Sequence, residues 1–146
     1  LRFGTLYGPR SDINNGLHLL ISESLKRKKI IYSGSPDSMR DYIHVLDAAK
    51  VCEKVLYNKD FENNTIVISG PESFKIKDVL RMISEITGIK KISYIKKNEI
   101  KKHTHYQMTP YSISKDQDYF AMKYSDQFNI DFGQGLKNLI LKIKKN

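Results

Sequence analysis

The sequence predicts an α/β fold. Short runs of apolar and β-branched residues bounded by Gly-Pro or Gly-Ser turns alternate with segments in which apolar residues recur every three to four positions. The chain has 146 residues, of which 40% are hydrophobic. A chain of this length and composition buries one modest core, so we expect a single domain over residues 1–146.

The first third of the chain predicts two strands with a helix between them. Residues 1–6 form an apolar run that ends at a Tyr-Gly-Pro-Arg turn, where the proline cannot continue a β-ladder. Residues 17–25 place leucine and isoleucine at helical spacing, and the basic residues 26–29 suit the negative end of a helix dipole. Residues 29–33 are expected to form the second strand.

A turn over residues 33–37 leads into a strand-like stretch that begins at Arg40, and this stretch is followed by a helix. Asp is a favoured N-cap residue, so we expect Asp47 to cap a helix that includes residues 48–56. Cys52 lies among the valines and the leucine of this helix, which predicts a buried thiol rather than a nucleophile.

The remaining elements are predicted from the same two patterns, namely short β-branched runs for strands and apolar residues every three to four positions for helices. Gly88 ends a clean apolar stripe at helical spacing, and a glycine readily takes the left-handed C-cap conformation. The residues between 96 and 107 show no period and are expected to form a loop. The predicted elements are a strand over 65–69, a helix over 76–86, a short strand over 92–95 and a C-terminal amphipathic helix over 136–143.

Composition restricts the class of protein. The net charge is +9, from 25 basic and 16 acidic residues, but the lysines are scattered and no basic helix or aromatic strand pair indicates a nucleic-acid surface. The single cysteine excludes an intramolecular disulfide and agrees with a reducing compartment. No apolar run approaches the roughly 20 residues of a membrane span, and the start lacks a signal-peptide pattern, so we expect a soluble, cytoplasmic protein.

Two sequence blocks indicate a family. The chain opens with LRFGTLYGPR, and RDYIHVLD follows at residues 40–47. Together they resemble the NAD-dependent nucleotide-sugar epimerase/dehydratase family of extended short-chain dehydrogenases. In that family a strand ending in R-[FY]-x-N-x-Y-G-P-R is later followed by R-D-[FY]-x-x-V-x-D. Either block alone is weak, and both in this order are fairly specific.

The resemblance also implies that a part of the family's sequence is absent from this chain. In the family both blocks follow the dinucleotide-binding sheet and the catalytic Tyr-x-x-x-Lys, and the 8 glycines here form no G-x-G-x-x-G. We therefore interpret the chain as the C-terminal, substrate-side portion of an extended short-chain dehydrogenase that lacks most of the Rossmann sheet. Residues 1–50 would be the end of the Rossmann part with the substrate loop, and residues 51–146 the C-terminal helical and strand part.

Arg40 is the first candidate for substrate binding. A guanidinium presents a planar fork of donors that matches a diphosphate, and the resemblance places the corresponding Arg on the diphosphate of the nucleotide-sugar. The alternative is an ion pair between Arg40 and Asp41. Tyr42, in the same motif, is assigned to the same site, with packing or orientation of the strand as its alternative.

The resemblance assigns roles to four more positions, and at a fifth, Thr5, the sequence departs from the family's pattern. Thr5 stands where the family usually has the Asn that bonds the substrate, and a hydroxyl offers fewer donors than an amide. Asn14 and Asn15 resemble the polar loop that closes over sugar and phosphate, and their alternative role is to cap the following helix. Phe3 and Gly4 correspond to positions near the nicotinamide, although core packing explains Phe3 equally well.

Two Tyr-x-x-x-Lys matches lie late in the chain, at Tyr111 with Lys115 and at Tyr119 with Lys123. One interpretation is that they belong to a permuted catalytic helix. The other is that they belong to the family's ordinary C-terminal stretch, which ends in a tail like the DFGQGL at residues 131–136. That tail favours the second interpretation, so no catalytic residue is assigned. No metal site is predicted either, because His103-x-His105 has no further ligand at suitable spacing.

The resulting hypothesis is the nucleotide-diphosphate-sugar binding half of an NAD-dependent epimerase or dehydratase, an isomerase or lyase of surface-polysaccharide synthesis. It is not expected to be catalytic alone. The full-length family uses NAD, and this chain alone is expected to bind none. The partners considered are a nucleotide-sugar, a separate Rossmann half and a second copy of the chain. The alternatives are a non-catalytic basic interaction module and the permuted enzyme.

Overall fold

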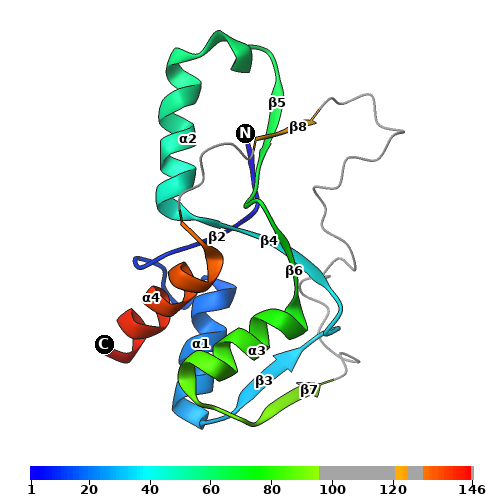
Figure 1. The fold of residues 1–146 in the computed structure, drawn as a ribbon, viewed down its shortest axis with the longest axis vertical. Coiled ribbons are helices and arrows are strands. Elements are labelled where there is room, and N and C mark those ends of the chain that lie inside the picture. The colour runs from blue at the N-terminus through cyan, green and yellow to red at the C-terminus, as the bar shows by residue number, and fades with distance from the viewer. Residues whose placement is uncertain (96–120, 125–129, 146) are drawn as a thin grey trace.

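The computed structural model of the chain describes residues 1–95, 121–124 and 130–145. Its elements form two groups on either side of β4 (Met39–His44), which crosses the middle of the molecule (Figure 1). Successive side chains of a strand point to opposite faces, so β4 contributes to both groups. Tyr42 enters one hydrophobic cluster, and its neighbour Ile43 enters the other.

The smaller group is built on a parallel sheet with the strand order β1-β5-β8. Residues from α2 and β5 make up its buried cluster, together with Ile43 and Phe61. A helix between two strands of this kind covers the sheet and buries its apolar side. The elements are β1 (Arg2–Phe3), α2 (Val45–Tyr57), the 3-10 turn η1 (Lys59–Phe61), β5 (Thr65–Ile68) and β8 (Ala121–Tyr124).

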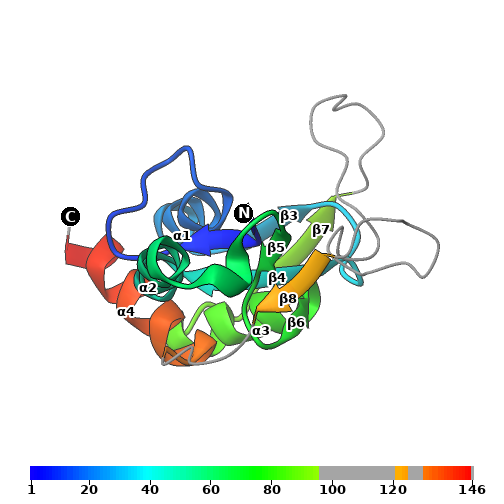
Figure 2. The same cartoon turned by 90° about the horizontal axis from the view of Figure 1, so that it is seen from above.

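The larger group is mainly helical and contains the larger hydrophobic cluster. Its helices α1 and α4 are in contact, α3 packs against α4, and β3 pairs in parallel with β7. From above, α4 lies at the opposite side of the molecule from β7 (Figure 2). The elements are α1 (Gly16–Arg27), β3 (Ile30–Ser33), α3 (Ile76–Thr87), β7 (Ile92–Ile95) and α4 (Phe132–Lys145).

The strand predicted over residues 1–6 is divided at Gly4. The first part is β1, which pairs with β5, and the second is β2 (Thr5–Tyr7), which pairs in parallel with β4. A Cβ on Gly4 would lie 2.9 Å from the carbonyl oxygen of Asp41, so the strand changes neighbour where only glycine fits. A further strand that the sequence did not predict, β6 (Ser73–Lys75), pairs antiparallel with β4.

The predictions for 17–25, 29–33, 65–69, 76–86, 92–95 and 136–143 are confirmed to within a few residues. Gly88 caps α3 with a positive φ of 77°, as expected. Two predictions about α2 are wrong. His44, not Asp47, is the N-cap, and Cys52 is exposed, because the helix begins three residues earlier and the buried positions are Asp47, Ala48 and Val51. The residues between 96 and 107 lie outside the described part of the chain, and among the described helices none is long and apolar enough to cross a membrane.

Gly70 gives a direct test of the packing around β4. A Cβ at this position would overlap the carbonyl oxygen of Tyr42, whereas a Cβ on Gly16 would meet no atom within 4 Å. We expect Gly70→Ala to lower the free energy of unfolding by about 1–3 kcal/mol or more, as overpacking does. Gly16→Ala, at the first position of α1, should leave it within about 0.5 kcal/mol or raise it.

Urea unfolding of both variants and the parent chain checks this expectation. An equal effect of the two substitutions would contradict the close approach of Gly70 to β4.

Candidate functional site

A cavity of about 760 Å³ follows α1 along its length, and it is larger than a second cavity described below. It begins at the N-terminal end of the helix, near Asn14, and continues to Arg27 and Lys29 at the other end. A helix of twelve residues is roughly 18 Å long, so the cavity suits an elongated ligand. Its walls come mainly from apolar residues of three elements, namely Leu17, Leu19, Leu20, Ile31, Ile76, Val79 and Leu80.

Thr5 and Tyr42 line this cavity side by side. They are register partners in the parallel pairing of β2 with β4, which places both on the same face. Tyr32 of β3 lines the same space. Burial is the main reason why the pKa values of Tyr32 and Tyr42 are raised. Both phenols therefore remain protonated at neutral pH and can donate a hydrogen bond.

Arg40 is half-buried at the edge of this region. It is not among the residues that line the cavity, but its positive charge acts on both lining phenols, lowering their pKa values against the larger effect of burial. One guanidinium nitrogen, Nη1, donates to the carbonyl of Met39 at 2.6 Å. Asp41 points to the other face of β4, where its carboxylate accepts a hydrogen bond from the Ser73 hydroxyl.

The two asparagines have different roles in the structure. Asn15 is the N-cap of α1: its Oδ1 accepts from the backbone N–H groups of Leu17 and His18, and its Nδ2 donates to the carbonyl of Leu6 at 2.8 Å. Asn15 thus connects the helix to β2 and has the capping role that was the alternative to substrate binding. Asn14 is exposed and lines the cavity, whereas Asn15 is not among the lining residues.

Charged residues at the far end of this cavity were not predicted as site residues. Arg27 and Lys29 line it, and Arg27 forms an ion pair with Glu23 at 2.8 Å. In the sequence Arg27 and Lys29 belong to the basic run at the end of α1, and a favourable interaction with the helix dipole is enough to explain their charge. Only the packing of β3 beside α1 brings them to the cavity.

Phe3 and Gly4 line neither cavity. Phe3 packs against the smaller cluster, and Gly4 donates its N–H to the carbonyl of Ile68 at 2.8 Å. The described residues also do not fit the pyrophosphate of NAD. The two glycines in the first turn of α4 are the nearest to a glycine-rich turn, but Gly135 packs against the Tyr7 ring.

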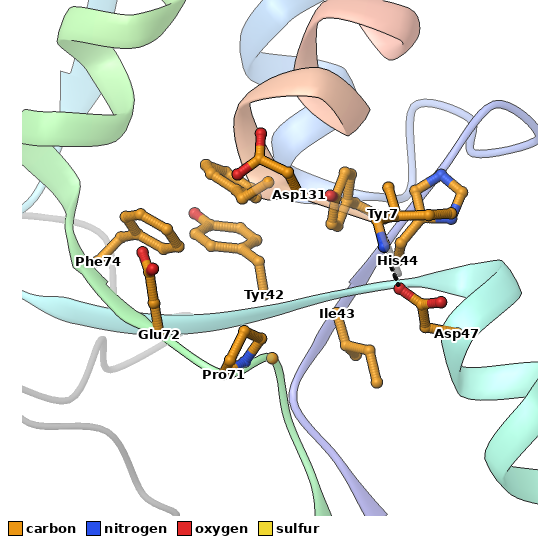
Figure 3. Close-up of a pocket in the computed structure, with 12 residues that line it drawn as sticks. Tyr7, Tyr42, Ile43, His44, Asp47, Pro71, Glu72, Phe74 and Asp131 are labelled. Atoms are coloured by element: carbon orange, nitrogen blue, oxygen red, sulfur yellow. Dashed lines mark hydrogen bonds between the residues drawn. The ribbon is translucent and has the colours of Figure 1, made fainter. Parts of the chain in front are cut away.

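The smaller cavity, of about 250 Å³, lies where β4, the start of α2, the turn before β6 and the start of α4 meet (Figure 3). Aromatic rings from these elements pack together there: Phe132 stacks on Tyr42 at 4.7 Å and lies 4.6 Å from Phe74, while Tyr7 meets Phe132 edge-on at 5.3 Å. Three carboxylates also line it, those of Asp47, Glu72 and Asp131.

Two side chains hold this cavity together. Nδ1 of His44 accepts the N–H of Leu46 at the start of α2. Asp47, which is buried, accepts the N–H of Ile130 at 3.2 Å and so fixes the chain just before α4. Histidine is not among the usual N-cap residues, so the contact of His44 with Leu46 could not be predicted from the sequence.

The two Tyr-x-x-x-Lys matches cannot be placed against this site. Tyr111, Lys115 and Tyr119 lie outside the described residues, as do His103 and His105, and Lys123 is in β8. Within the described part of the chain, no group of three or more His, Cys, Asp or Glu residues could hold a metal ion.

Comparison with known proteins supports the resemblance that the two sequence blocks carry. Residues 1–69 match the NAD dependent epimerase/dehydratase family. An uncharacterised UDP-glucose epimerase of Bacillus subtilis is 32% identical over 90 residues, which are 62% of this chain and 28% of the relative. The resemblance inferred from the two sequence blocks is confirmed.

Solved structures of extended short-chain dehydrogenases share the fold over 99% of this chain. A dTDP-glucose 4,6-dehydratase from Bacillus anthracis, in complex with NAD, is 22% identical with a TM-score of 0.73. A UDP-glucuronic acid 4-epimerase from Bacillus cereus, in complex with UDP-glucuronic acid and NAD, is 20% identical with a TM-score of 0.75. The chain spans 44% of each of these structures and 28% of the curated relative.

The His44 cap makes the stability of the fold depend on pH. Burial lowers the pKa of His44, an effect partly offset by the charge of Asp47. Because the folded pKa lies below the unfolded value of about 6.5, the unfolded chain takes up the proton first, and protonation of Nδ1 removes the acceptor. The stabilisation from this group is therefore complete above about pH 6.5 and is lost as pH falls through the folded pKa.

We expect His44→Asn, which keeps an N-cap acceptor but does not titrate, to have a flatter dependence of unfolding free energy on pH than the parent chain. Urea unfolding between about pH 7.5 and pH 5.5 measures this, across the ordinary His pKa of about 6.5. Parallel pH profiles for the two chains would contradict the role of His44.

Proposed function

We propose that this chain provides the nucleotide-diphosphate-sugar binding part of an NAD-dependent sugar epimerase or dehydratase. The observation that carries the proposal is the larger cavity, where Thr5, Asn14 and Tyr42 lie along one elongated space with Arg40 beside its two phenols. These are four of the five positions that the sequence assigned to the substrate. The fifth, Asn15, contributes by fixing the start of α1.

Each group has a role that its chemistry supports. The Arg40 guanidinium would neutralise the diphosphate, and the Tyr32 and Tyr42 phenols would donate hydrogen bonds to phosphate or sugar oxygens. Thr5 and Asn14 would contact the sugar end. The apolar wall formed by Leu17, Leu20 and Ile76 suits the faces of the nucleobase and ribose, because ligand cavities are mostly apolar with a few placed polar groups.

The relatives support the choice of ligand. The matching structure from Bacillus cereus was solved with UDP-glucuronic acid, and one from Thermotoga maritima, a UDP-glucose 4-epimerase 18% identical to this chain, with UDP-glucose. In the whole enzyme, NAD would accept hydride from a sugar hydroxyl and return it after epimerisation or elimination. The reaction class, a cytoplasmic location, a role in surface polysaccharides and a separate Rossmann partner are parts of the same proposal.

Substitution of Arg40 tests the proposed function. We expect Arg40→Ala to raise the Kd for UDP roughly thirtyfold, because a charge-assisted contact to phosphate contributes about 2 kcal/mol. Lys142→Ala, which removes an exposed cation of α4, should change the Kd less than about threefold. Titration calorimetry of the parent and both variants provides the comparison.

Circular dichroism and the melting profile serve as folding controls, because Arg40 also bonds the backbone at Met39. A natively folded Arg40→Ala chain that binds UDP as well as the parent would remove Arg40 from the site. A steep fall in affinity with salt, shared by several lysine variants, would instead favour the basic interaction module.

NAD binding gives an independent expectation. The described residues provide no glycine-rich strand-to-helix turn for the pyrophosphate, so the 146-residue chain should show no saturable binding of NAD at micromolar concentrations. Calorimetric titration with NAD measures this directly. A micromolar Kd would overturn the interpretation of the chain as the substrate-side half.

A further inference from the structure

Six basic residues gather at the end of the larger cavity that lies beside the C-terminus of α1. Lys28 is the C-cap of α1, and the N–H of Ile30 donates to the carbonyl of Lys91 at 2.9 Å, where the parallel strands β3 and β7 begin. The end of α1 and the starts of both strands therefore meet at one corner of the molecule, at the bottom of Figure 1. This basic corner consists of Lys26, Arg27, Lys28, Lys29, Lys90 and Lys91.

Few carboxylates accompany the basic corner. Residues 24–36 and 86–95 contain no Asp or Glu, and the carboxylate closest in sequence is Glu23, which pairs with Arg27 at 2.8 Å. Within the described part of the chain, the other five cations form no ion pair. Lys29 is half-buried and the rest are exposed. The corner therefore presents an excess of positive charge to the solvent.

The basic corner is continuous with the larger cavity. Arg27 and Lys29 line the far end of the cavity, and Arg27 is exposed, so this end opens to solvent beside the other four cations. The walls of the cavity are mainly apolar and include Leu20, Ile31 and Val79. A cleft with charges of one sign and walls of low dielectric constant focuses the electric field, and this raises the local concentration of an oppositely charged ligand.

A nucleotide-sugar is a multiply charged anion, because its diphosphate is ionised at neutral pH. We propose that the basic corner guides an anionic nucleotide-sugar into the larger cavity and so raises the rate constant of its association, kon. This role rests on the proposed function, in which Arg40 holds the diphosphate of the bound ligand. Arg40 acts through a contact in the complex, whereas the corner acts at a distance before the complex forms. Charges at the rim of a binding site mainly change kon and its dependence on salt.

The helix dipole explains only a part of the basic corner. Arg27 and Lys28 lie at the C-terminus of α1, where a cation interacts favourably with the dipole. Lys90 and Lys91 lie beyond Gly88, the C-cap of α3, and the effect of a dipole falls off within the last turn of its helix. Solubility benefits from positive charge at any exposed position. A comparison with equally charged residues elsewhere on the surface therefore separates guidance from solubility.

Charge reversal at Lys90 and Lys91 tests the proposal without altering the cavity, because neither residue lines it. The probe is UDP labelled with an N-methylanthraniloyl fluorophore, mixed with the chain in a stopped-flow instrument. At low ionic strength we expect Lys90→Glu/Lys91→Glu to lower kon at least about tenfold, with the dissociation rate constant koff unchanged within about twofold. In about 1 M salt, where the Debye length is about 3 Å, the two chains should differ in kon by less than about twofold.

The matched control Lys50→Glu/Lys59→Glu makes the same change in net charge. Both lysines are exposed, and they lie on α2 and η1, at the top of Figure 1 and away from the basic corner. We expect this control to lower kon less than about threefold, because salt screens charges that are more than a Debye length from the cavity. Displacement of the probe by unlabelled UDP shows that both bind at one site.

The proposal is overturned if Lys90→Glu/Lys91→Glu leaves kon unchanged, if the control lowers kon as much, if the loss persists in high salt, or if koff accounts for it. Binding of the probe with unchanged kon overturns the guiding role alone, whereas a parent chain that binds no UDP overturns the proposed function as well. Circular dichroism checks the fold of each variant. If the reversed variant is not native, Lys90→Gln/Lys91→Gln takes its place, with an expected fall in kon of about threefold, and an unchanged kon has the same consequence.

Discussion

The alternation of side chains along β4 is the constraint on which the rest of the structure depends. Tyr42 points into the larger hydrophobic cluster and Ile43 into the smaller one, so a single strand joins both. A shift of the register by one residue would exchange these faces and expose both sets of side chains. The pairing of Tyr42 with Thr5 in β2, and of Asp41 with Ser73 in β6, fixes that register from both sides.

The two cavities follow from the same alternation. Tyr42 lines both of them, and α1 with β3 encloses the larger one, whereas the starts of α2 and α4 enclose the smaller one. Asp47 connects α2 to the segment before α4, and Asn15 connects α1 to β2. In each contact a side chain at the start of a helix bonds a backbone group of another segment of the chain. The ends of helices, rather than their middles, therefore determine the shape of both sites.

The sequence predicted the elements that have a clear period. The apolar stripe before Gly88 and the β-branched run at residues 65–69 are of this kind, since local pattern and tertiary burial agree there. The apolar neighbours of Cys52 predict a buried thiol, but α2 turns Asp47, Ala48 and Val51 inward and leaves Cys52 exposed. β6 has three residues, which is too short for a periodic signal.

Only those residues of the candidate site that match the family's motifs could be predicted from the sequence. Thr5, Asn14 and Tyr42 were assigned from the motif, and they line one cavity. Arg27 and Lys29 join them through the contact of α1 with β3, and such long-range packing leaves no local mark in a sequence. The smaller cavity likewise combines residues more than a hundred positions apart, from Tyr7 to Phe132.

The most direct test of the account is an NMR titration of the isotopically labelled 146-residue chain with UDP. The account predicts saturable shifts at the backbone amides of Thr5, Asn14, Tyr32 and Tyr42, around the larger cavity, with α4's exposed lysines unaffected. Shifts centred on the lysines of α4, or no saturable shift in the residues around the larger cavity, would contradict it.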